Sequence, residues 1–172
     1  MAVLDLYRRA TRVPVVGRGA FSLAFALKAP YFLTIAPTLV ELRPNHAEVR
    51  VRKWWGVHNH IGTVHVIAVA NGLEMAMGAL AEATIPPQLR WIPKGMELEY
   101  LAMADSTLVA TADTDPADWT GPGEIDVRVQ ATRQDGTVVV RGVIRLHISE
   151  RKRVAAEPAT ARKGRRVSAV AD

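Results

Sequence analysis

The twenty residues from Val64 to Ala83 constrain the fold most. They read VHVIAVANGLEMAMGALAEA and are rich in Ala, Leu and Met, which favour an α-helix. Such a helix is apolar nearly all the way round, so most of its sides must be buried in a core. Its apolar part, residues 66–81, is shorter than the roughly 20 apolar residues that a membrane span needs, and it contains Asn71 and Glu74. The sequence therefore predicts no transmembrane segment.

Alternating apolar and polar residues on both sides of this run predict antiparallel strands. Residues 33–41 and 47–54 read as a hairpin around Pro44 and Asn45. After Pro86 and Pro87 the alternation returns at residues 96–100, 106–112, 125–129 and 137–148, with a turn at Asp135 and Gly136. Two short helices, at residues 4–11 and 20–28, come first, and Pro30 stops the second. The predicted fold is α+β, with five to six antiparallel strands around one long central helix.

Length and charge predict one domain with a basic tail. A chain of 172 residues suits one domain, placed at residues 1–150 with a helical segment at 1–30. Through Glu150 there are 15 Lys and Arg against 15 Asp and Glu, so the whole net charge of +5 lies in residues 151–172. That tail lacks apolar periodicity, which predicts a mobile segment. The neutral body predicts no nucleic-acid partner, although phosphate contact by the tail stays open as an alternative.

Residue types that the chain lacks exclude several classes of function. There is no cysteine, so disulfides, thiolate metal sites and a cysteine nucleophile are excluded. The lack of cysteine and of a secretory signal pattern predicts a cytoplasmic protein. The GxGxxG, GxxxxGK[ST] and GxSxG motifs are also absent, which argues against a dinucleotide-binding fold, a nucleotide triphosphatase and a serine hydrolase.

Glu74 is the first candidate for chemistry, because a carboxylate within an apolar helix is costly unless it is paired, hydrogen-bonded or neutralised. Asn71 and Gly78 lie three residues before and four residues after it, so all three share one stripe of the helix. Gly78 leaves space on that stripe, which favours a substrate-binding role for Asn71 and Gly78. The structural alternative is an ion pair between Glu74 and Arg141 or Arg145.

The segment 59–65, NHIGTVH, places polar and flexible residues before the helix start. Unpaired N–H groups and the positive end of the helix dipole can bind an anionic or polarised oxygen there, next to Gly62 and Thr63. Thr63 could instead be the helix N-cap, and His65 a hydrogen-bonded core histidine. The spacing of His58, His60 and His65 matches no familiar zinc pattern, so no metal site is predicted.

The order of these elements resembles the hotdog fold, in which a curved sheet wraps a central helix. The pattern N-x-x-G-T-x-H, followed nine residues later by a carboxylate, resembles the PaaI-type acyl-CoA thioesterases of that superfamily. Its matching residues here are Asn59, Gly62, Thr63, His65 and Glu74. The segments APYFLTIAPTLVELRPN and GLEMAMG resemble the DUF4442 branch of the superfamily.

The resemblance implies hydrolysis of an acyl-CoA or related acyl thioester. It implies a homodimer, or a tetramer built from it, whose sheets join edge to edge so that each site draws on both subunits. Coenzyme A would enter as part of the substrate, and no separate cofactor is implied.

The resemblance also implies a role for each site residue. Glu74 would be the general base or nucleophile, Asn59 would position water or substrate, and His65 would lie beside the thioester. N–H groups near His65 and Val66 would bind the developing oxyanion. Relatives usually follow the histidine with two glycines, where this chain has Val66 and Ile67. That difference favours the alternative of a non-catalytic acyl-CoA or lipid-binding protein, whereas a hotdog hydratase or dehydratase fits the residues around His65 less well.

Overall fold

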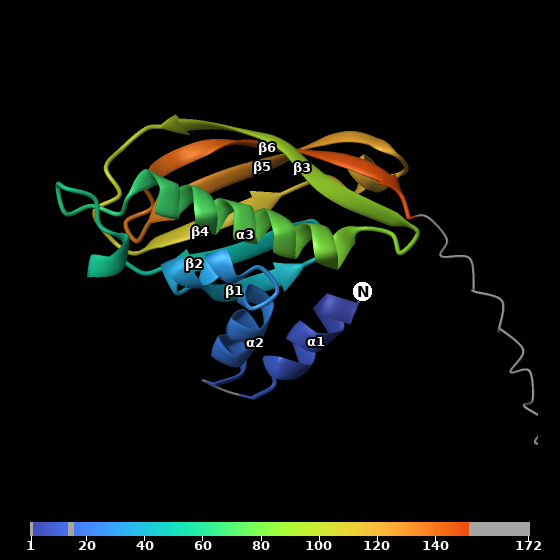
Figure 1. Ribbon diagram of the computed structural model, residues 1–172, viewed down its shortest axis with the longest axis horizontal. Coiled ribbons are helices and arrows are strands. Elements are labelled where there is room, and N and C mark those ends of the chain that lie inside the picture. The colour runs from blue at the N-terminus through green and yellow to red at the C-terminus, as the bar shows by residue number, and fades with distance from the viewer. Residues whose placement is uncertain (1, 14–15, 152–172) are drawn as a thin grey trace, which may run out of the picture.

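The computed structural model describes residues 2–13 and 16–151 (Figure 1). Its first elements are α1 (Ala2–Ala10), α2 (Val16–Ala26), the 3₁₀ helix η1 (Pro30–Ile35), β1 (Thr38–Arg43), β2 (His46–Val51) and the 3₁₀ helix η2 (Trp55–Val57). The long helix α3 (Val66–Thr84) comes next. It is followed by β3 (Leu89–Tyr100), β4 (Leu108–Asp113), the 3₁₀ helix η3 (Pro116–Trp119), β5 (Gly123–Arg133) and β6 (Val138–Glu150).

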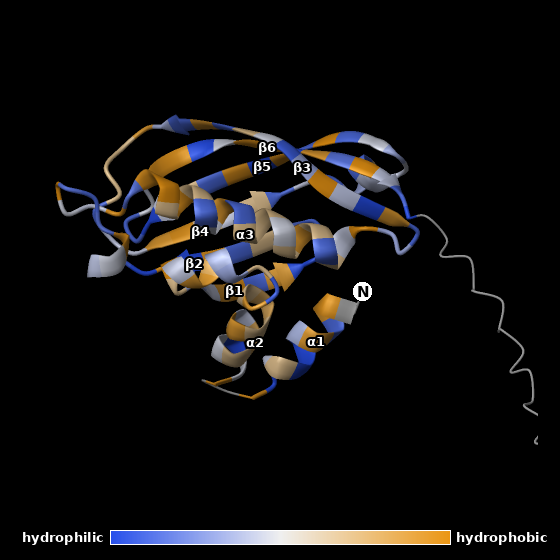
Figure 2. Cartoon of the chain, in the orientation of Figure 1, coloured by the Kyte–Doolittle hydropathy of each residue, from blue (hydrophilic) through white to orange (hydrophobic). Residues whose placement is uncertain are grey.

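The six strands form one antiparallel sheet in the order β1-β2-β4-β5-β6-β3. The sheet curves around α3, which lies along its concave face (Figure 1). Figure 2 shows the apolar and polar residues alternating along the strands, as the two faces of a half-buried sheet require. The predicted α+β fold is confirmed, with six strands around a central helix and short helices at the N-terminus.

Helix α3 forms the centre of the hydrophobic core. Leu73, Met77 and Leu80 are almost completely buried against the sheet. Gly72 lets the helix approach β2, because a Cβ atom there would lie 2.5 Å from Val51 Cγ2. In the described part of the chain, α3 alone is long and apolar enough to cross a membrane, but 67% of its apolar window is buried inside the fold. Its hydrophobicity therefore serves packing.

The beginning of the predicted first strand is wrong. Residues 33–35 lie in η1, and β1 starts only at Thr38. Pro30 opens η1 with a backbone angle that suits a helical turn, and Ala36 closes it with a left-handed φ of 45°. The aliphatic residues there pack as part of this turn.

Helices α1 and α2 cover the edge of the sheet at β1. The Tyr7 hydroxyl donates to Val40 O at 2.8 Å, and the backbone N–H of Leu39 donates to Ser22 Oγ at 2.8 Å. The Tyr7 and Phe21 rings meet edge to face, with their centroids 5.2 Å apart. Burial raises the pKa of Tyr7, so its hydroxyl keeps the proton that it donates. These contacts satisfy edge groups that would otherwise be open to another strand.

Strand β3 forms the other edge, on the side of the molecule opposite α1 and α2 (Figure 1). It pairs with β6 on one side, and no described strand pairs with it on the other. Pro93 and a register shift between Pro93 and Gly95 occur in this strand, which suits an edge position. The sheet ends at Glu150, and residues 152–172 lie outside the described part, so the mobile tail stays a prediction.

Candidate functional site

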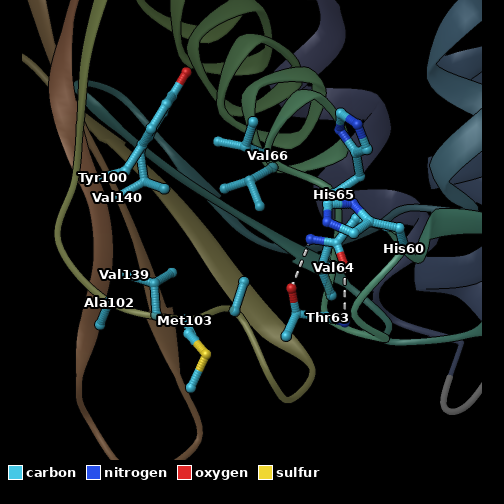
Figure 3. Close-up of a pocket in the computed structure, with 13 residues that line it drawn as sticks. His60, Thr63, Val64, His65, Val66, Tyr100, Ala102, Met103, Val139 and Val140 are labelled. Carbon is cyan, nitrogen blue, oxygen red and sulfur yellow. Dashed lines mark hydrogen bonds between the residues drawn. The ribbon is translucent and has the colours of Figure 1, made fainter.

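The loop before α3 is organised by the side chain of Asn59 (Figure 3). Asn59 Oδ1 accepts hydrogen bonds from the backbone N–H groups of Ile61 and Thr63, both at 3.1 Å. Asn59 Nδ2 donates to Thr63 Oγ1 at 2.8 Å. Gly62 takes a φ of +78°, a conformation that costs other residues free energy. Asn59, Gly62 and Thr63 thus form one turn that fixes the approach to the helix.

His65, and not Thr63, is the N-cap of α3. Its Nδ1 accepts from the backbone N–H of Ile67 at 3.1 Å. Accepting at Nδ1 places the ring proton on Nε2 when the imidazole is neutral. The Thr63 hydroxyl is bound to Asn59 instead, so the N-cap interpretation of Thr63 is wrong. His65 is exposed, so the core-histidine interpretation is wrong as well.

Val66 carries the free backbone N–H at the helix start. The His65 N–H donates to Val57 O at 2.7 Å, and the N–H groups of Ala68 and Val69 both donate to His65 O. The Ile67 N–H donates to the His65 ring. Among the described residues, the Val66 N–H has no acceptor. Of the N–H groups predicted near His65 and Val66 to bind an oxygen, only that of Val66 is available within the described residues.

A cavity of about 250 Å³ is lined in part by Val66. Asn59, His60, Thr63 and His65 form its polar end (Figure 3). The remaining walls are apolar apart from the hydroxyl of Tyr100, and they are made by Val64, Val66, Val69, Tyr100, Ala102, Met103, Ala104, Val139 and Val140. No local sequence pattern predicts the wall that β3, β6 and the loop after β3 contribute to this cavity. These segments meet because Tyr100 pairs with Val140 in the sheet.

Asn71 lies on a second cavity of about 250 Å³, which His65 and Ile67 also line. Its Nδ2 donates to Thr34 Oγ1 at 3.2 Å and to Tyr31 O at 3.4 Å. The Thr34 hydroxyl donates its own proton to Tyr31 O at 2.7 Å. Thr34 Oγ1 and Tyr31 O can therefore only accept from Asn71, which places the amide nitrogen of Asn71 toward them. Asn71 Oδ1 is buried without a hydrogen-bond partner in the described structure. This oxygen is therefore an acceptor left unsatisfied within the described residues.

Glu74 is half-buried, whereas the sequence analysis treats it as a buried carboxylate. It forms no ion pair with any residue of the described ranges. Arg141 pairs with Glu99 at 2.9 Å, and Arg145 pairs with acidic residues of β3 and β5. The structural ion pair weighed for Glu74 is therefore absent there, and its carboxylate is available for chemistry.

Glu74 and Val66 lie far apart along α3. Eight residues at 1.5 Å per residue separate them by about 12 Å along the axis, which exceeds the reach of a glutamate side chain. Ile67, on the same side of α3 as Glu74, is 53% exposed among the described residues. Neither of the two cavities described above is lined by Glu74.

Gly78 does not border an open space around Glu74. It lines a third cavity of about 200 Å³ with Phe25, Phe32 and Trp91. A Cβ atom at Gly78 would lie 3.6 Å from the Trp91 ring, an ordinary contact. A substrate-binding role for Gly78 would therefore have to act through this separate cavity.

One group of side chains in the described structure has metal-ligand spacing, namely Glu41, His46 and Glu48. His46 Nδ1 lies 2.7 Å from Asp113 Oδ1, and Arg43 Nε donates to Glu41 Oε1 at 2.9 Å. His46 and Glu41 thus already have hydrogen-bond partners in the described structure. His58, His60 and His65 are not part of any such group in the described ranges.

Comparisons with known proteins identify the family. A family model, the domain of unknown function DUF4442, matches residues 17–148. The crystal structure of a genomics target, APC5556, is 40% identical with a TM-score of 0.77, and the match covers 88% of this chain and 100% of that chain.

Two more distant structures share the fold. PA5026 from Pseudomonas aeruginosa, of unknown function and described as a probable thioesterase, is 20% identical with a TM-score of 0.68, covering 74% of this chain and 91% of that one. A thioesterase family protein from Silicibacter pomeroyi is 17% identical with a TM-score of 0.61. That match covers 73% of this chain and 93% of the other. No curated protein matches the sequence. The resemblance to the DUF4442 family and to the hotdog fold is confirmed: the chain belongs to the DUF4442 family, and it shares its fold with these two structures.

Proposed function

We propose that the protein hydrolyses an acyl thioester, such as an acyl-CoA, at a site completed by a second copy of the chain. One observation carries the proposal: Val66, which has the free N–H at the helix start, lines an apolar cavity, and α3 also carries an unpaired carboxylate. An N–H donor and a general base are the two groups that thioester hydrolysis needs. Their separation within one chain explains why a second copy is required.

The unpaired edge of β3 supports this dimer. A two-fold pairing of β3 with its counterpart would extend the sheet across both copies and satisfy the open edge groups. It would also cover the side of α3 that carries Ile67 and Glu74. In this arrangement Glu74 of one copy would approach the helix start of the other. A tetramer would add further contacts without changing the site.

The chemistry assigns a role to each residue. The thioester carbonyl oxygen accepts from the Val66 N–H while the acyl group enters the apolar cavity. Glu74 takes a proton from water, the hydroxyl oxygen adds to the carbonyl carbon, and the carbon–sulfur bond of the tetrahedral intermediate breaks. The thiolate takes up a proton, so the products are a carboxylic acid and a free thiol.

The remaining polar groups position the reactants. Asn59 and Thr63 hold the loop, with Gly62 at its tight turn, and so would orient the Val66 N–H toward the substrate. The His65 Nε2–H can donate to the thioester or to the part of the substrate beyond it. No separate cofactor takes part, since coenzyme A is a portion of the substrate, and such substrates fit a cytoplasmic protein.

A specific observation favours a second candidate, a non-catalytic acyl-CoA or lipid-binding protein. The Val66 side chain lines the cavity at the position where related thioesterases usually have glycine. A bulkier residue there narrows the approach to the N–H without closing the apolar cavity. Such a protein would retain an acyl ligand and release no thiol.

The test is thiol release from acyl-CoAs of short, medium and long chain, read with a thiol reagent. The chain contains no cysteine, so the protein itself adds no signal. We expect turnover with at least one chain length and a maximum set by the size of the cavity. Saturable binding of the same acyl-CoAs without thiol release would establish the binding protein instead.

A further inference from the structure

Positive charge is concentrated in residues 2–35, here called the N-terminal layer, which comprises α1, α2 and η1. Its basic side chains are Arg8, Arg9, Arg12, Arg18 and Lys28, against the single acidic Asp5, which gives a net charge of +4. Residues 36–151 carry 11 basic and 14 acidic side chains, a net charge of −3. The N-terminal layer is therefore positively charged and residues 36–151 are negatively charged, although the sum of the two is close to zero.

Several cations of the described residues have no ion-pair partner, among them Arg50, Arg90 and Lys94 of the sheet and all five of the N-terminal layer. None of the five forms an ion pair with another described residue. Five arginines of the sheet do so, namely Arg43, Arg128, Arg133, Arg141 and Arg145. Apart from Arg18, which lies close to the Tyr7 hydroxyl, the basic groups of the layer are thus available to an external anion.

Large apolar side chains are exposed on the same layer. Val16, Leu23 and Leu27 recur at helical spacing along α2 and the turn that continues it, and they are 65%, 54% and 57% exposed. The opposite face of α2 buries Phe21 and Ser22 against β1. A surface helix of a globular protein normally has polar residues on its outer face. Leu6, Val13, Tyr31 and Leu33 are also exposed.

We propose that the N-terminal layer binds the surface of a membrane that contains anionic phospholipids. Leu23 and Leu27 would enter the boundary between headgroups and acyl chains, and the arginines would lie at the lipid phosphates. Figure 2 shows the mixture of apolar and polar residues on α1 and α2 that such a boundary requires. Pairing of this layer with the same layer of a second copy would bring two positive surfaces together, which argues against that occupant.

The layer is held in a fixed position for this role. Tyr7 and Ser22 bond to the backbone of β1, so the surface exists without any rearrangement. It lies on the side opposite β3, so membrane contact leaves that edge strand free (Figure 1). The inference does not depend on thioester hydrolysis.

The test is co-sedimentation of the full-length protein with vesicles of phosphatidylcholine alone or mixed with phosphatidylglycerol. We expect binding to the anionic vesicles and little to the neutral ones. The double variant Leu23→Gln/Leu27→Gln should weaken binding by about tenfold or more, because the apolar contact is lost at constant charge. Arg8→Glu/Arg9→Glu should weaken it as strongly, whereas the matched control Arg50→Glu/Arg52→Glu on β2 and just beyond it should retain most of the binding.

Two controls decide between the possible causes. The basic residues 151–172 are present in every variant, so equal binding of wild type and Leu23→Gln/Leu27→Gln would show that charge alone attracts the vesicles and would overturn the proposal. Light scattering measures the mass of the same variants. A fall in mass for the leucine variant would assign the apolar stripe to a second copy, which also overturns the proposal. Unchanged thermal unfolding would show that the variant is folded.

Discussion

Replacing Glu74 with glutamine is expected to reduce acyl-CoA turnover by about 10²- to 10⁴-fold, because the substitution removes the proposed general base. The amide has nearly the same shape, so the loss would report on proton transfer and not on packing. Glu74 is half-buried and forms no ion pair within the described ranges, so the folded state loses no strong contact. We therefore expect the thermal unfolding temperature and the dimer mass to stay close to wild type.

Glu82→Gln is the matched control for this variant. Glu82 lies two turns further along α3, is also half-buried, and its Oε1 accepts from Trp91 Nε1 at 3.1 Å. Glutamine can keep that hydrogen bond through its own Oε1. Turnover of Glu82→Gln should match wild type. Equal turnover of Glu74→Gln and wild type would remove Glu74 from the mechanism.

Replacing Val66 with proline is expected to reduce turnover by about 10²- to 10³-fold, because it deletes the one proposed oxyanion donor. Val66 is the first residue of α3, where proline is well tolerated. His65 has φ −61° and ψ 135°, which suits a residue that precedes proline. The Val66 N–H has no acceptor in the described structure, so no internal hydrogen bond is lost. The helix should therefore form, and steady-state kinetics should show the loss mainly in kcat.

Val66→Ala distinguishes the contribution of the Val66 backbone N–H to turnover from that of its side chain. Alanine keeps the N–H and shortens the side chain that lines the cavity. We expect Val66→Ala to hydrolyse acyl-CoA at least as fast as wild type. If Val66→Pro and Val66→Ala had the same kcat, the backbone N–H would have no part in the reaction.

The main elements of the fold follow from local patterns. The composition of residues 64–83 predicted a buried helix, and α3 occupies 66–84. Alternation predicts the strands after the first one, because one face of the sheet meets the core and the other meets solvent, although β3 begins at Leu89, seven residues before the predicted start. The error at residues 33–35 has a local cause, since a short aliphatic run fits a strand or a turn equally well until Pro30 and Ala36 decide the backbone.

The site was only partly predictable, because its details depend on contacts between distant segments. Of the N–H groups of His65 and Val66, only that of Val66 is free within the described part of the chain, because the His65 N–H donates to Val57 O, a contact that the sequence does not reveal. His65 is the N-cap in place of Thr63, because the Thr63 hydroxyl is hydrogen-bonded to Asn59. The apolar wall of the cavity needs the pairing of Tyr100 with Val140, which no local pattern specifies.

The position of Glu74 shows a further limit of the sequence. The spacing of Asn71, Glu74 and Gly78 on one stripe of the helix predicts a space next to the carboxylate. Asn71 and Gly78 instead line different cavities, and Glu74 lies on the open side of α3. A site shared between two copies leaves no complete pattern in either copy.

Co-expression of Glu74→Gln and Val66→Pro chains with two different affinity tags tests the shared site most directly. Purification on both tags yields mixed dimers, in which one site combines the native Val66 of one chain with the native Glu74 of the other. We expect mixed dimers to regain about half of the wild-type activity, because one of two sites is intact, while each parent dimer stays inactive. Mixed dimers as inactive as both parents would place Glu74 and the Val66 N–H in the same chain's site, or outside the reaction altogether, and would contradict the account.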